Sequence, residues 1–547
     1  MHRAAAEYYR SRGIPERLEE ALNVIYLRGP REDVYGELVN FLTRHCAAPV
    51  ICGVQGRKVL DGSGLPALEV QVRCTVRNIE KTVSSVTVAA SSDSPQLVSS
   101  EANEKERVKS VDVAIEWIKR DLSPLITGIS PSDQTSIDRL LREYFKPKRE
   151  EARERMKSAQ DVSPSPTTST PTSSPKPGKK KSSAKGKKTV VVEKPIPPKE
   201  PMEPTIWGSP AIRAISLAVA KSSAALSDTP LYLYIASLKD EQPPAEFTMP
   251  SPMISLLSYG KASSGKLNLM KEVIVIPGPG RSLQEPVSPL GCLVLGCDRI
   301  DQPLELMGEA CEHLGLELGT DLHLALNCAA HDLMDYNKGR YEVLSGTYKT
   351  PDEMVDIYAD LIRRFPSVIA LLDPLRREDT AQWQSLANTL TGKCYLISDV
   401  SCKPISWLLE ENLNVPLSSG AVIRHSHEAS VCDLLDVSRH IQGRNGLLVL
   451  GCCDEEPCDD SLADLVSGLL EQRCSFSIYV MSPRLNPLSS LQAVGLGAQF
   501  VKLGGLLRGE RTTKYNRLLA IEEALRLGGA LGMTHYISGI IYWIQSV

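Results

Sequence analysis

The sequence predicts an α/β protein whose C-terminal half folds as a barrel. From about residue 247 onward, short apolar runs alternate with helical patterns such as the one from Pro351 to Arg364. Parallel strands buried on both faces are expected to be apolar throughout, and such alternation is typical of the βα units of a barrel. The apolar runs cover residues 273–276, 322–326, 367–372, 395–397, 421–423 and 447–450.

The segment from Phe500 to Leu525 predicts one strand, one tight loop and one helix. The apolar run ends at Val501, two glycines follow, and leucine and isoleucine then recur at helical spacing. Because α/β barrels carry their chemistry at the carboxyl ends of the strands, we expect Lys502 to bind an anion. The alternative is a lysine whose alkyl chain lies along the strand end and whose ammonium group stays in water.

Composition points to a multidomain intracellular protein. The chain has 547 residues, 42% of them hydrophobic, which is enough for two or three domain cores. A net charge of -4 argues against nucleic acid or an anionic membrane as a partner. The 14 cysteines lack the spacing of a disulfide framework and the N-terminus has no signal-like apolar stretch, so we expect a cytoplasmic protein with reduced thiols.

Residues 1–45 predict a separate unit of two short amphipathic helices. The helices begin after Pro15 and Pro30 and carry two apolar stripes, formed by Leu18, Leu22 and Ile25 and by Val34, Leu38, Phe41 and Leu42. Two such helices cannot bury their stripes alone, so the stripes meet a partner, a second copy or the neighbouring domain. The run also resembles the docking and dimerisation motif of kinase-regulatory subunits, which implies a helical anchor partner.

Residues 146–205 predict a disordered linker. This stretch is rich in proline, serine and threonine and then in lysine, with almost no large apolar residue before Val190. Its lysines could contact nucleic acid or acidic proteins, but no aromatic residues lie among them, which favours a solvated tether.

Several segments resemble the enolase (phosphopyruvate hydratase) family, in the order that family has them. They are GRKVLDGSGLPALEVQV at 56–72, AIRAISLAVAKSSAALSDTPLYLYIA at 211–236, ALLDPL at 370–375 and the strand, loop and helix that begin at Phe500. The resemblance implies an enolase-type α/β barrel as the C-terminal domain, at 247–547, with an insertion near 470–493. It also implies an α+β N-terminal capping domain in two parts, 46–145 and 206–246, interrupted by the disordered linker.

The resemblance also implies a reaction, the dehydration of 2-phosphoglycerate to phosphoenolpyruvate with Mg²⁺ and a lysine base. The segment AVIRHSHEASV places Arg424 at the position of that general-base lysine. A guanidinium group, with a pKa of about 12.5 to 13.8, is neutral in only about a millionth of molecules at pH 7, so Arg424 is expected to hold an anion but to be a poor base. Glu272 and Lys502 stand at preserved substrate-binding positions.

The implied magnesium ligands are largely replaced. Asn327 and Leu372 stand at two of the three carboxylate positions, and Asp399 is the one carboxylate kept. Magnesium is held mainly by carboxylate oxygens, so this set is expected to bind it weakly unless Asp332, Asp335 or Asp373 compensates. Cysteines 452 and 453 and three acidic residues at 454–456 stand where the family contacts the substrate phosphate, and like charge repels a phosphate.

Two functions therefore remain open. The first is a phosphopyruvate hydratase weakened by these substitutions, with a homodimer implied by the family. The second is a non-catalytic structural or adaptor protein that docks partners through its N-terminal helices. The segments are most similar to the divergent male-germ-cell branch of the family, which implies a cytoplasmic location that extends to the sperm flagellum.

Overall fold

The structure is a computed structural model. It describes residues 3–29, 32–61, 64–89, 100–161, 204–239, 247, 249–259, 265–277, 293–294, 296–400, 408, 419–424, 428–443, 447–451, 459, 461, 500–505 and 509–531. The predicted insertion at 470–493, the cysteines at 452 and 453, the acidic residues at 454–456 and the last 16 residues, 532–547, lie outside these ranges.

Helices occur in every part of the described chain. They are α1 (Arg3–Ser11), α2 (Ile14–Leu27), α3 (Val34–Thr43), α4 (Ser100–Trp117), the π-helical turn η1 (Ile118–Leu122), α5 (Ser123–Ile126), α6 (Gln134–Asp161), α7 (Pro210–Leu226), α8 (Leu231–Lys239), α9 (Gln302–His313), the 3₁₀ turn η2 (Ala330–Leu333), α10 (Pro351–Arg364), α11 (Thr380–Leu390), α13 (Val431–Gly443) and α16 (Gly509–Leu527).

The strands form three sheets. They are β1 (Val50–Leu60), β2 (Pro66–Val76), β3 (Ile79–Ala89), β4 (Ser251–Pro252), β5 (Ile254–Ser258), β6 (Glu272–Pro277), β7 (Leu293–Val294), β8 (Leu322–Asn327), β9 (Met334–Asp335), β10 (Arg340–Leu344), β11 (Thr347–Lys349), β12 (Val368–Leu372), β13 (Tyr395–Asp399), β14 (Gly420–Arg424), β15 (Leu447–Gly451) and β16 (Phe500–Lys502).

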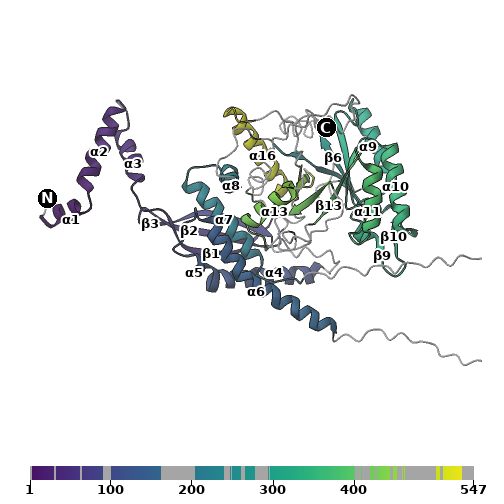
Figure 1. Ribbon diagram of the computed structural model, residues 1–547, viewed down its shortest axis with the longest axis horizontal. Coiled ribbons are helices and arrows are strands. Elements are labelled where there is room, and N and C mark those ends of the chain that lie inside the picture. Colours follow the sequence, from purple (N-terminus) through teal and green to yellow (C-terminus); the bar gives the residue numbers. More distant parts are fainter. Residues whose placement is uncertain are drawn as a thin grey trace, which may run out of the picture.

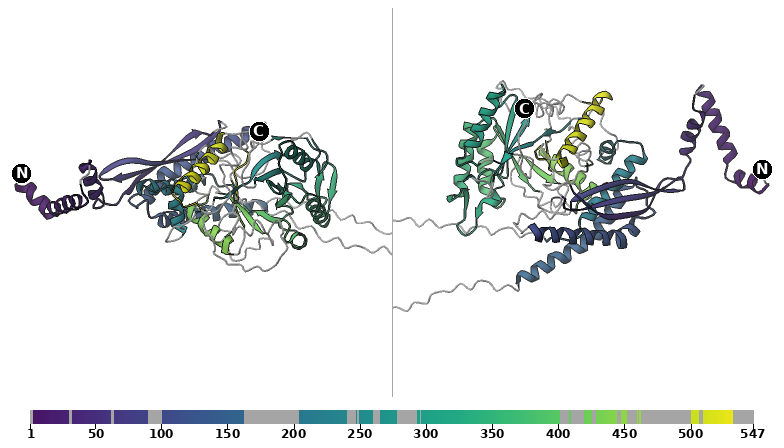
Figure 2. Two further views of the ribbon diagram at one scale, coloured as in Figure 1. Left: turned by 90° about the horizontal axis from the view of Figure 1, so that it is seen from above. Right: turned by 180° about the vertical axis from the view of Figure 1, so that it is seen from behind.

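The N-terminal helices stand away from the rest of the molecule (Figures 1 and 2). The predicted helices are α2 and α3, and α3 begins at Asp33, whose carboxylate accepts the backbone N–H of Gly36 at 2.7 Å. A preceding helix, α1, was not predicted. Leu18 and Leu22 of the α2 stripe are 38% and 54% exposed, whereas Ile25 is buried, so in the single chain the neighbouring domain does not cover all of this stripe.

The next domain has the predicted α+β arrangement. Strands β1, β2 and β3 form an antiparallel sheet, and the two-residue turn between β2 and β3 places Arg77 and Asn78 at positive φ, as tight hairpin turns require. Helices α4 and α7 pack against this sheet. In α7, residues on every face are buried, because the helix lies between the sheet and the barrel.

The linker begins later than the sequence predicted. Helix α6 continues to Asp161, so residues 146–161 of the predicted linker are helical, with Pro147 inside the helix. Arg and Glu one turn apart, as in the pair Arg155–Glu151, support this solvated segment. Composition alone does not reveal such a helix, because charged residues one turn apart also occur in solvated linkers. The rest of the predicted linker, from 162 to 203, lies outside the described residues.

The C-terminal half is a closed barrel, as predicted. Its sheet runs β4-β16-β15-β14-β13-β12-β8-β6-β5-β7. Strands β4 and β5 are two parts of one strand on either side of Met253; β4 pairs with β16 and β5 pairs with β6. With β7 set outside β5, eight strands make the ring among the described residues. The ring is filled by apolar side chains from these strands, including Ile274, Ile369 and Phe500.

One strand of the ring departs from the expected all-parallel βα pattern. Strand β6 is antiparallel to both of its neighbours, β5 and β8. The chain between β5 and β6 contains no helix among its described residues, so β6 runs back along its neighbour instead of crossing over to the same direction. The start of β6 therefore lies at the carboxyl ends of the parallel strands.

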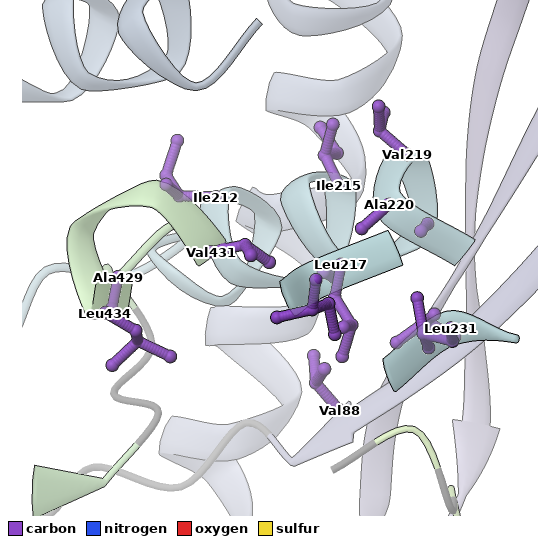
Figure 3. Close-up of a cluster of buried hydrophobic side chains, with 14 of the residues drawn as sticks. Val88, Ile212, Ile215, Leu217, Val219, Ala220, Leu231, Ala429, Val431 and Leu434 are labelled. Atoms are coloured by element: carbon purple, nitrogen blue, oxygen red, sulfur yellow. The ribbon is translucent and has the colours of Figure 1, made fainter. Parts of the chain in front are cut away.

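The two domains share one hydrophobic core. Figure 3 shows Leu217 of α7 beside Val88 of β3, and Val431 from the start of α13 on the barrel beside α7; all three belong to one buried cluster. The buried carboxylate of Asp138 joins the same layers, because its Oδ2 accepts the backbone N–H of Cys432 at 3.0 Å. In the described part of the chain, no helix combines the length and the apolar character needed to cross a bilayer.

Candidate active site at the barrel mouth

The predicted site residues lie on one rim of the barrel. Asn327, Leu372, Asp399, Arg424 and Lys502 are each the last residue of their strand. Because β6 is antiparallel, its first residue, Glu272, pairs with Asn327 on the same rim. Arg424 and Lys502 both pair in register with Gly451, so they stand on either side of the same strand end. The ring therefore brings the predicted site residues together at one mouth.

Glu272 and Lys502 form a buried ion pair. The ammonium Nζ lies 2.8 Å from Oε2 of Glu272, and the two side chains are 5% (Glu272) and 11% (Lys502) exposed. Two further groups donate to the same carboxylate: Ser255 Oγ at 2.7 Å and Asn327 Nδ2 at 3.0 Å. Burial alone raises the pKa of Glu272, but the charge of Lys502 and the hydrogen bonds from Lys502 and Ser255 lower it to about 2. Glu272 is thus held ionised and cannot donate a proton near neutral pH.

Arg424 and Asp399 form a second ion pair beside the first. Nη2 of Arg424 donates to Oδ2 of Asp399 at 3.1 Å, and each side chain is 22% exposed. The guanidinium group of Arg377 also donates to the backbone carbonyl of Asp399. These contacts hold Asp399 in place and surround it with two cations.

Asp373 belongs to the site, although the sequence named it only as a possible substitute ligand. It directly follows β12, is buried, and has a φ of 47°, in the left-handed region that aspartate tolerates better than most residues. Its Oδ1 accepts the backbone N–H of Asp399 at 2.9 Å. Burial and the charge of Asp399 raise the pKa of Asp373 to about 7, against the opposing charges of Arg377 and Arg424. An acidic residue directly after an apolar strand is the signal that could have identified it.

The other two candidate acids pair with groups other than Asp399. Asp332, in the turn after β8, pairs with Lys271 at 3.6 Å and with His331 at 3.3 Å. Asp335 accepts the backbone N–H groups of its own turn and lies 3.2 Å from Lys338. Of the three candidates, only Asp373 adjoins Asp399.

The residues at the predicted magnesium position do not fit such a site. Leu372 offers no donor atom, Asn327 donates its amide N–H to Glu272, and the carboxylate of Asp399 accepts from Arg424. Magnesium requires several oxygen ligands in near-octahedral geometry. Within the described ranges, no three His, Cys, Asp or Glu side chains are grouped so that they could hold a metal ion.

Comparisons with known proteins agree with this architecture. A family model described as "Enolase, C-terminal TIM barrel domain" matches residues 291–470. The chain is 52% identical over 563 residues to Enolase 4 of Xenopus laevis, covering 97% of this chain and 93% of the relative. It is 42% identical over 587 residues to Enolase 4 of Homo sapiens (97% and 89% covered) and 40% identical over 594 residues to that of Mus musculus (98% and 91% covered).

Proposed function

Because the chain belongs to the enolase family, we propose that it acts on 2-phosphoglycerate, forming phosphoenolpyruvate and water in glycolysis at a rate well below that of a fully equipped enolase. The observation that carries the proposal is the convergence of Glu272, Arg424 and Lys502 on one rim of the barrel. These residues come from strands far apart in the sequence, and chemistry in such barrels takes place at this end.

The two cations are proposed to bind the substrate. Lys502 and Arg424 flank one strand end, so a small dianionic or trianionic ligand at the rim could contact both cationic head groups. The planar fork of an arginine matches a carboxylate or a phosphate, and charge-assisted hydrogen bonds are the strongest that a protein offers to such groups. Glu272 orients the ammonium group of Lys502 through their ion pair.

Proton removal limits the proposed rate. The reaction needs a base that removes the proton from the carbon next to the substrate carboxylate. The position implied for this base holds Arg424, whose guanidinium group is almost never neutral. Members of the enolase family generally use Mg²⁺, which stabilises charge that develops on the substrate. Since the residues present do not fit that ion, we assign no step to it.

Turnover of 2-phosphoglycerate by the purified full chain tests the proposal. We expect slow formation of phosphoenolpyruvate, followed by its ultraviolet absorbance with excess Mg²⁺, and faster formation by Arg424→Lys, which restores a group that can lose its proton. Arg299 forms an exposed ion pair with Glu305 on the barrel surface. Arg299→Lys is therefore the matched control and should leave the rate unchanged. Absence of turnover in both the wild type and Arg424→Lys would refute the proposal.

The N-terminal helices support a second candidate function, that of a docking scaffold. Leu18 and Leu22 of α2 and Val34 and Val39 of α3 are exposed on a hairpin that stands away from the body (Figure 1). Two short helices with solvated apolar residues gain stability when another helical surface covers them. The proposed occupants are a second copy of the chain, which gives a homodimer, or an amphipathic anchor helix.

Deleting residues 1–45 tests this second function without touching the barrel mouth. The molar mass from light scattering and the set of co-purifying helical partners are compared for the full and shortened chains. Loss of dimer mass or of a partner supports docking, whereas identical mass and partners contradict it. Turnover of 2-phosphoglycerate by the shortened chain separates the two functions.

We also propose a cytoplasmic location that extends to the sperm flagellum, on the resemblance to the germ-cell branch of the family. Immunofluorescence of the protein in sperm tests this location. Signal confined to another compartment would contradict it.

A further inference from the structure

We infer that the barrel mouth binds its anionic ligand, a small phosphorylated or carboxylated acid, without a divalent metal ion, because arginine supplies the positive charge at the position where the family's metal would be held. This inference deepens the proposed function and takes 2-phosphoglycerate from it as the probe. It concerns binding alone and does not require turnover.

The first support is the position of the guanidinium group. Asp399 is the one family metal ligand that remains, and its carboxylate oxygen accepts from Nη2 of Arg424 at 3.1 Å. Arg377 donates to the backbone carbonyl of the same residue. A metal ion that used the carboxylate of Asp399 would have to displace the guanidinium group of Arg424 or share the carboxylate with it. The cation that Asp399 faces is therefore already part of the chain.

The second support is the charge inventory of the rim. Three cations, Lys502, Arg424 and Arg377, lie beside three carboxylates, those of Glu272, Asp373 and Asp399. The neighbouring pair of Lys271 and Asp332 adds one charge of each sign. A rim of carboxylates alone would repel a phosphate unless metal ions neutralised it. Here the fixed cations offset the carboxylates, so an anion can approach without an added ion.

The third support is the space made for arginine. Gly451, the in-register neighbour of Arg424 on β15, has no side chain. A Cβ built there would lie 3.1 Å from Cγ and 3.3 Å from Nε of Arg424, tighter than most contacts of real Cβ atoms. The stem of the arginine therefore lies directly over the glycine. The neighbouring strand end accommodates this side chain, and other residues at 451 would push against it.

Calorimetric titration of the full chain with 2-phosphoglycerate tests the inference. It is carried out once with excess EDTA and once with excess Mg²⁺, and inorganic phosphate serves as a second probe. We expect the same dissociation constant in both conditions, and a loss of about tenfold to a hundredfold for Arg424→Met, because charge-assisted hydrogen bonds are removed. Arg299→Met, on the exposed surface, is the matched control and should bind as the wild type does.

Three results would overturn the inference: binding only with Mg²⁺, no binding in either condition, or unchanged affinity in Arg424→Met. Circular dichroism checks that the variant folds. Should it fail to fold, Arg424→Lys, which keeps the charge but loses the fork, must bind in EDTA with affinity reduced several-fold. Turnover in the same samples separates the two proposals. Metal-independent binding without turnover supports this inference and refutes the catalytic proposal. Turnover together with binding that requires Mg²⁺ supports the catalytic proposal and refutes this inference.

Discussion

Replacing Glu272 by glutamine should destabilise the barrel in a way that depends on pH. Contacts in the fold lower the pKa of Glu272 from its ordinary value of 4.5 to about 2. Since one pKa unit corresponds to about 1.4 kcal/mol, the ionised carboxylate contributes about 3 kcal/mol to the free energy of unfolding at pH 7. A folded-state pKa below the unfolded one means that this contribution is present above pH 4.5 and disappears as the pH falls towards 2.

Urea denaturation at pH 7 and pH 3, for the wild type and Glu272→Gln, measures this contribution. We expect a loss of about 3 kcal/mol or more at pH 7, since the buried ammonium group of Lys502 also loses its partner. At pH 3 the loss should be about 2 kcal/mol smaller, because the ionised carboxylate of the wild type then contributes less to the free energy of unfolding. Glu305→Gln, which removes an exposed pair with Arg299, is the control and should cost less than about 1 kcal/mol at both values.

An equal loss for Glu272→Gln at pH 7 and pH 3 would refute the reasoning. It would mean that the carboxylate is not held ionised by Lys502 in solution. A loss at pH 7 no greater than that of the control would refute the buried ion pair itself.

Three further changes test other parts of the structure. Gly451→Ala should weaken 2-phosphoglycerate binding and lower the free energy of unfolding by about 1–3 kcal/mol, since its Cβ meets Arg424. Gly308 has open space around it, so Gly308→Ala is the control and should be neutral or stabilising. Equal effects of the two substitutions would contradict the close contact at Gly451. Leu22→Asp on the exposed face of α2 should turn a dimer into a monomer in light scattering, and an unchanged dimer would exclude this surface. Thr350→Ala removes the capping box of α10 and should cost about 1 kcal/mol in thermal or urea unfolding, where no change would count against the cap.

Much of the fold could be read from local patterns. Apolar runs and helical spacing identified six strands of the ring and the strand, loop and helix from Phe500, because a buried strand is apolar wherever the chain places it. The same local signal missed α1 and ended α6 too early, since charged helices stabilised by pairs one turn apart look like solvated linker by composition.

The sequence named candidate site residues but not the contacts between them. Family resemblance named Glu272, Asp399, Arg424 and Lys502, and the closed ring brings them together. It could not show that Lys502 neutralises Glu272 or that Arg424 lies against Asp399, because these contacts join strands distant in sequence. The place of Asp373 in the site could not be predicted for the same reason, because it depends on the hydrogen bond to Asp399 on the next strand.

The amino-acid sequence alone determined the types of element, the barrel class and the chemical character of each strand end, because side-chain hydrophobicity and spacing act locally. Only the tertiary structure decided that β6 runs antiparallel and so brings Glu272 to the mouth. It also decided that Arg424 contacts Asp399 and that Leu18, Leu22 and Val34 of the N-terminal stripes stay exposed. Ion pairing and burial depend on which distant segments come into contact, and the closure of the ring determines those contacts.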